Sequence, residues 1–177
     1  VLGLVLIELG INDWFSNKIK NVINNSVFVA ESYLEEHKET IKGDVYAMSN
    51  DLNNSSEVLK EDLSKMARAL RTQALIRSLP ETYIINKNRD VLFQALNNNM
   101  PFYEPPLSSF ERADGGEMII MSSTQVNKVY ALIKLNNFDD YYLFAGRSMD
   151  GNVISALNDT VSAKKEYTFL EISRDKI

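Results

Sequence analysis

Sulfur and imidazole chemistry are almost absent from this 177-residue sequence, which has no cysteine and a single histidine, His37. Without cysteine, the chain can form no disulfide, no thiolate nucleophile and no sulfur-ligated zinc site. With one histidine, a metal site would consist mostly of carboxylates. We therefore expect no metal and interpret His37 as a solvated residue of a helix.

Positive charge and nucleotide-binding motifs are also scarce. The 19 Lys and Arg residues face 24 Asp and Glu, and a net charge of -5 provides no positive field for a nucleic-acid backbone. Gly115 and Gly116 form an isolated pair, without a GxGxxG, GxxxxGK or GxSxG pattern. We expect no nucleic acid, no cofactor and no catalytic residue, and an unrecognised hydrolase is the least favoured alternative.

The chain begins with an apolar run, VLGLVLIELGI, at residues 1–11. This run is shorter than the ~20 apolar residues that cross a bilayer. By residue pattern alone it is either the outer end of a membrane helix, with Trp14 at the interface, or an apolar helix end packed in the fold.

Residues 12–79 are predicted to form a helical hairpin. No proline occurs before Pro80, and apolar residues recur at helical spacing from Ile19 to Leu52. The polar residues 53–56 interrupt this pattern, and Asn54 with Glu57 resembles the capping box of a second helix, which continues to about Arg77.

Residues 80–150 are predicted to form an antiparallel sheet, because the apolar period changes from helical spacing to that of strands. Five strands are expected, at residues 82–85, 91–95, 118–122, 128–135 and 141–146. An irregular proline-containing loop is expected at residues 97–116, and residues 151–177 return to helical spacing as a C-terminal helix. The predicted fold class is α+β, with a helical hairpin, a five-stranded sheet and a final helix.

Aromatic residues gather in the predicted strands and in the proline-containing loop, which is typical of a small-molecule pocket. The predicted ligand contacts are Tyr130, Tyr142 and Arg147. Alternation along the strands places Arg147 opposite Tyr142, so it joins them only if Gly146 bends the strand. The alternative is that the aromatic residues are core and that the arginines form surface ion pairs.

Two segments carry a resemblance to a known family. The first is GINDWF followed by SVFVAESYLEEHKETIKGDVYAMSNDL, and the second is YYLFAGRSMDGNVISALNDTVSAKKEYTFLE. Both resemble the region flanked by membrane helices in NtrY-like sensor histidine kinases of the nitrogen-regulation type. The resemblance implies a PAS-like (single Cache) sheet on the periplasmic side of the inner membrane, with residues 1–11 as the end of a membrane helix.

The resemblance implies that this chain senses a signal, while a kinase outside it acts on a response regulator. The chain itself is expected to be non-catalytic, because His37 lacks the acidic neighbour and nearby proline of a kinase phosphoacceptor. We expect a homodimer formed through the long first helix and an unknown small-molecule or membrane signal. The alternative is a structural or protein-interaction helical module without a ligand.

Overall fold

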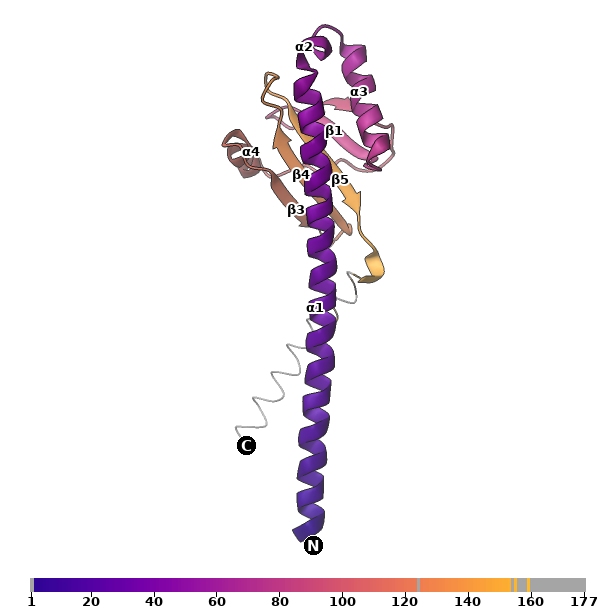
Figure 1. The fold of residues 1–177 in the computed structure, drawn as a ribbon, viewed down its shortest axis with the longest axis vertical. Helices are drawn as coiled ribbons and strands as arrows, with labels where there is room; N and C mark the ends of the chain where they lie inside the picture. Colours follow the sequence, from indigo (N-terminus) through magenta and orange to yellow (C-terminus); the bar gives the residue numbers. More distant parts are fainter. Residues whose placement is uncertain (1, 124, 154, 156–158, 160–177) are drawn as a thin grey trace. The chain divides into compact units, whose positions relative to one another are not determined.

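The computed structural model describes residues 2–123, 125–153, 155 and 159 (Figure 1). It divides into two compact units, one made of Val1–Glu35 with Asp150–Ile177 and the other of Glu36–Met149. The predicted C-terminal helix, residues 151–177, lies largely outside the described residues. We describe each unit by itself.

The first helix, α1, extends from Leu2 to Asn54, so it contains both the helix end expected at residues 1–11 and the first helix of the predicted hairpin. An unbroken helix is possible because no proline occurs along it. Within the first unit, the Lys18 ammonium lies 4.9 Å from the centroid of the Trp14 ring. The described helices contain no segment whose length and hydropathy would allow it to cross a membrane.

The end of α1 belongs to the second unit and buries one apolar stripe against the sheet. Ile41, Val45, Met48 and Leu52 are almost fully buried, and each contributes on the order of 2 kcal/mol of hydrophobic stabilisation. These residues belong to the stripe expected to join two copies of the chain, but they are already covered within one copy. A homodimer formed through α1 stays a prediction.

The connection after α1 differs from the predicted capping box. A short helix, α2, spans Ser56–Leu59 without a side-chain cap, and the main second helix, α3, spans Leu63–Ile76. The N-cap of α3 is Asp62, whose Oδ1 accepts hydrogen bonds from the Ser64 backbone N–H at 2.9 Å and from its hydroxyl at 2.7 Å. Asp62 caps α3 because its extended backbone lets the carboxylate reach the backbone N–H groups of the first turn.

All five predicted strands are present and form one antiparallel sheet. They are β1 (Glu81–Ile85), β2 (Val91–Gln94), β3 (Ile119–Ser123), β4 (Lys128–Lys134) and β5 (Tyr142–Ser148). Their order is β2-β1-β5-β4-β3, so the first and the last of these five strands in the sequence pair near the centre. The fold is therefore α+β, as predicted.

The loop predicted at residues 97–116 contains a helix, α4, at Leu107–Asp114. The prolines of this segment favoured an irregular loop, but Pro106 precedes the first helical residue, where no backbone N–H is needed. The Ser109 hydroxyl donates to the Pro106 carbonyl at 2.5 Å, and Gly115 ends the helix.

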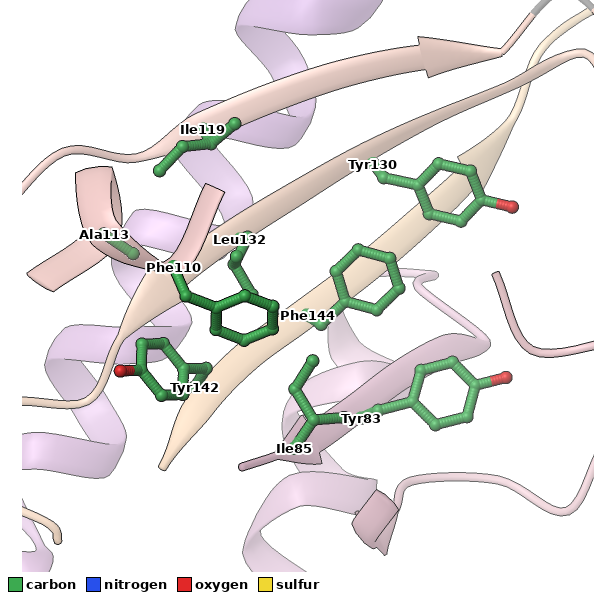
Figure 2. Close-up of a cluster of buried hydrophobic side chains, with 9 residues drawn as sticks. All are labelled: Tyr83, Ile85, Phe110, Ala113, Ile119, Tyr130, Leu132, Tyr142 and Phe144. Atoms are coloured by element: carbon green, nitrogen blue, oxygen red, sulfur yellow. The ribbon is translucent and has the colours of Figure 1, made fainter. Parts of the chain in front are cut away.

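The two faces of the sheet carry different side chains. We call the face covered by α1 and α3 the helix face, and the face covered by α4 and the loop before it the aromatic face. The core of the aromatic face consists of Tyr83, Ile85, Phe110, Ala113, Ile119, Tyr130, Leu132, Tyr142 and Phe144 (Figure 2).

Candidate functional site

The structure places two of the three predicted ligand residues on one face and the third on the other. Tyr130 and Tyr142 belong to the aromatic face. In the β4–β5 register, Tyr130 lies opposite Gly146 and Val129 lies opposite Arg147, so alternation continues through Gly146. Because Gly146 does not bend the strand, Arg147 points to the helix face and the three residues are not brought together.

Tyr130 belongs to a stacked group of three rings, in which Tyr103 and Phe144 also lie 6.3 Å from each other. Its ring lies 4.5 Å from that of Tyr103 and 5.3 Å from that of Phe144, both nearly parallel to it. Burial, with a smaller effect from the nearby Glu81 carboxylate, raises the pKa of Tyr130 to about 12. The hydroxyl therefore stays protonated at neutral pH and is a poor general base.

Gly146 makes this stack possible, because a Cβ atom there would lie 2.7 Å from Tyr130 Cε1 and 3.1 Å from Glu81 Oε2. The missing side chain also opens a passage across β5. Through it the Glu81 carboxylate of β1 reaches the Lys128 ammonium of β4 at 2.6 Å, although these strands are not neighbours. The two side chains are only 5% and 13% exposed, so this is a buried ion pair.

Tyr142 takes part in a separate polar group at the end of α4. Its hydroxyl donates to Asp114 Oδ1 at 2.5 Å, and the Lys87 ammonium donates to Asp114 Oδ2 at 2.9 Å. The Tyr142 and Lys87 hydrogen bonds lower the pKa of Asp114 to about 2, and burial raises the pKa of Tyr142. In Figure 2 the Tyr142 hydroxyl points away from those of Tyr83 and Tyr130.

Arg147 is already bound to a carboxylate of the same chain. Its guanidinium donates to Asp44 Oδ2 of α1 at 2.9 Å and to the backbone carbonyl of Arg77, after α3, at 3.1 Å. The Arg77 guanidinium lies 3.9 Å from the other Asp44 oxygen and 3.4 Å from Asp51. We call Asp44, Arg77 and Arg147 the clasp, since it joins α1, α3 and β5.

The partners of these residues could not be predicted from the sequence, for a physical reason. Glu81 and Lys128, like Asp44 and Arg147, are far apart in the sequence, and only the strand order and the packing of α1 bring them together. The one local signal was Gly146, because a glycine inside a strand often marks a close approach of other atoms.

Side chains of the chain itself cover the aromatic face. Phe102 and Tyr103, from the loop before α4, pack on it together with Phe110. Two cavities lie within residues 36–149, with volumes of about 480 Å³ and about 200 Å³, and neither is lined by Tyr130, Tyr142 or Arg147. Across the described part of the chain, no group of three His, Asp or Glu side chains is placed to hold a metal ion.

These features define an α+β domain with a long N-terminal helix, in which Glu81, Lys128, Tyr142 and Arg147 of the sheet each bind a polar group of the same chain. The model of the NtrY N-terminal region family matches residues 1–175, and the chain belongs to this family.

Three relatives indicate the proteins in which such a region occurs. The chain is 32% identical over 179 residues to "Putative sensor histidine kinase NtrY-like" of Rickettsia conorii, and equally so to the protein of that name from Rickettsia felis. Each match covers 100% of this chain and 30% of the relative. "Nitrogen regulation protein NtrY" of Azorhizobium caulinodans is 31% identical over 175 residues, which cover 98% of this chain and 23% of the relative.

The chain thus spans less than a third of the length of these relatives. No solved structure matches it significantly.

Proposed function

We propose that this chain is the extracytoplasmic sensing region of a two-component sensor histidine kinase, and that it passes a stimulus on through the segments at its two ends. Membership of the NtrY N-terminal region family supports this role, as do the names of the relatives. The sheet, with its first and last strands paired, supports a PAS-like (single Cache) module. Kinase activity and the response regulator would belong to the parts of such a receptor that this chain does not cover.

The proposed transmission of a stimulus rests on the clasp. Asp44 lies on α1, the helix through which the chain enters the sheet unit, and Arg147 lies on β5, the strand through which it leaves. A stimulus that moves β5 against α1 must stretch or break the ion pair between them. The intact and the broken clasp would then be two states with different contacts, which coupling between two sites requires.

The test uses the full-length receptor in membrane vesicles, with autophosphorylation from labelled ATP as the readout. We expect Asp44→Asn and Arg147→Met each to change basal autophosphorylation by about fivefold, the factor that corresponds to ~1 kcal/mol of coupling. The double variant Asp44→Asn with Arg147→Met should change activity no more than either single variant, because both remove the same ion pair. Arg68→Met, an exposed change on α3, is the matched control.

Circular dichroism of each variant shows whether its fold is intact. Folded Asp44→Asn and Arg147→Met receptors whose autophosphorylation equals that of the parent would refute transmission through the clasp.

The alternative function, a protein-interaction module without a ligand, is supported by one observation. Phe102, Tyr103 and Phe110 fill the face on which Tyr130 and Tyr142 lie, so a ligand there must displace them. Thermal-shift screening with small carboxylates and amines separates the two functions. A shift that is lost in Tyr130→Phe or Tyr142→Phe supports a ligand on the aromatic face, whereas no shift with any compound favours the interaction module.

A further inference from the structure

The smaller cavity, of about 200 Å³, lies on the helix face at the end of the sheet where the β4–β5 turn meets α2 and α3. Its lining includes Phe93 of β2 and Phe138 and Tyr141 of the turn. Phe93 pairs in register with Ile84, whose neighbours Tyr83 and Ile85 belong to the aromatic face, so it points to the helix face.

The three rings form a continuous aromatic wall. Tyr141 stacks on Phe138, with ring centroids 5.4 Å apart, and meets Phe93 edge to face at 5.9 Å. Met66 of α3 adds a thioether to the lining. Aromatic faces are negative in their electrostatic potential, and a cavity bounded by several of them favours a cation that is easily desolvated.

A cation of the chain already lies against this wall. The Lys60 ammonium is 5.7 Å from the centroid of the Phe138 ring, within the range of a cation–π contact. Asp139 also lines the cavity, and its carboxylate makes no ion pair with any described residue. The cavity thus combines aromatic faces, a carboxylate that forms no ion pair with a described residue, and an exposed lysine at the position of a cation.

We propose that this cavity binds a small organic cation of the quaternary ammonium class, which displaces the Lys60 ammonium from Phe138. A lysine ammonium is compact and strongly hydrated and remains exposed here, so its contact with the ring is weak. A trimethylammonium group has a diffuse charge and an apolar surface, so it gains more from the rings and loses less hydration. Its charge would be balanced by Asp139.

The site is also held in place before any ligand arrives. The side chain of Asn53, at the end of α1, accepts from the Asn137 backbone N–H at 3.2 Å, and its carbonyl accepts from the Asn137 side chain at 2.9 Å. These bonds fix the turn that carries Phe138 and Asp139. A preorganised cavity loses little conformational entropy on binding.

The experiment compares choline with its uncharged carbon isostere, in which a tert-butyl group replaces the trimethylammonium group. Binding to the 177-residue chain is followed by NMR chemical-shift titration. We expect choline to bind at least about fivefold more tightly than the isostere, with shifts centred on the β4–β5 turn. This arm measures binding alone and does not depend on the proposed sensing function.

Three substitutions locate the site. Lys60→Met should tighten choline binding by removing the competing cation, whereas the exposed change Lys65→Met is its matched control and should have no effect. Asp139→Asn should weaken choline binding about fivefold, and Phe138→Leu should weaken it by a similar factor while binding of the isostere changes little.

Several results would overturn the proposal. Equal affinities for choline and the isostere would show that the site does not select charge, and the absence of any choline binding would show that no site exists. Lys60 and Asp139 are exposed surface residues, so unchanged binding in both Lys60→Met and Asp139→Asn is decisive even if Phe138→Leu fails to fold.

Discussion

Replacing Gly146 by alanine tests how firmly the ring stack is held in the sheet. The new Cβ would lie 2.7 Å from Tyr130 Cε1 and 2.8 Å from Cδ1. Non-bonded carbon atoms prefer separations of about 3.5–4.0 Å, so the ring must move by on the order of 1 Å. It has little freedom to do so, because the Tyr103 ring stacks on it at 4.5 Å and the Phe144 ring lies 5.3 Å away.

The expected cost follows from this geometry. Overpacking a well-filled core costs ~1–3 kcal/mol, and we expect about 2–3 kcal/mol because the obstruction is a stacked ring rather than the end of a flexible side chain. For a chain of this size the loss lowers Tm by roughly 5–10 °C. The matched control is Gly43→Ala on α1, where no heavy atom lies within 4 Å of the new Cβ. This change should stabilise the protein by ~0.5–1 kcal/mol through helix propensity.

Thermal unfolding followed by circular dichroism, with urea titration at one temperature, measures both effects. In a Tyr130→Val background the obstructing ring atoms are gone, so Gly146→Ala should cost much less than in the parent. A Tm for Gly146→Ala equal to that of the parent, or the same cost in both backgrounds, would refute the close approach as the reason for glycine.

Three further substitutions test the polar groups of the fold. Glu81→Gln should lower the free energy of unfolding by about 2–4 kcal/mol in urea titration, because the largely buried Lys128 ammonium loses its counter-charge. The double variant Glu81→Gln with Lys128→Met should recover most of this loss. Asp114→Asn should cost about 1–2 kcal/mol at neutral pH through the loss of charge-assisted hydrogen bonds. Folding lowers the pKa of Asp114 from 3.8 to about 2. This stabilisation is therefore fully present at pH values above the pKa of the unfolded state, and it is lost as the pH falls through the pKa of the folded state. The difference between parent and variant should therefore shrink on acidification, and a constant difference would contradict the assignment. Asp62→Ala should lower Tm by removing the cap of α3, whereas Asn54→Ala should leave Tm unchanged. A lower Tm for Asn54→Ala with an unchanged Tm for Asp62→Ala would instead support the capping box predicted from the sequence.

The five strands were predictable because their signal is local. Alternating apolar residues separated by polar turns need no knowledge of the tertiary structure, and each predicted strand lies within two residues of the observed bounds. The helix α4 was missed because the prolines and the glycine pair within residues 97–116 favour an irregular loop. Proline ends a helix only when it falls inside one, and Pro106 lies just before the first turn.

The candidate site was less predictable than the fold. Alternation correctly assigned Tyr142 and Arg147 to opposite faces, and the proposed bend at Gly146, which would have united them, does not occur. The carboxylate that Arg147 binds could not be found from spacing, because Asp44 reaches it only after α1 packs on the sheet. Tertiary contacts of this kind leave no periodic trace in the sequence.

The position of β5 has a consequence for how the domain is assembled during synthesis. Although it follows the other four strands of this sheet in the sequence, β5 pairs with β1 on one side and β4 on the other, so it completes the middle of the sheet rather than an edge. Until it emerges, the β1–β2 hairpin and the β3–β4 hairpin are separate pieces, each with an edge strand whose backbone groups lack their final partner. A chain that stops before Tyr142 would therefore lack the strand that connects the two hairpins, whereas removal of β2 or β3 would remove only an edge strand of the sheet.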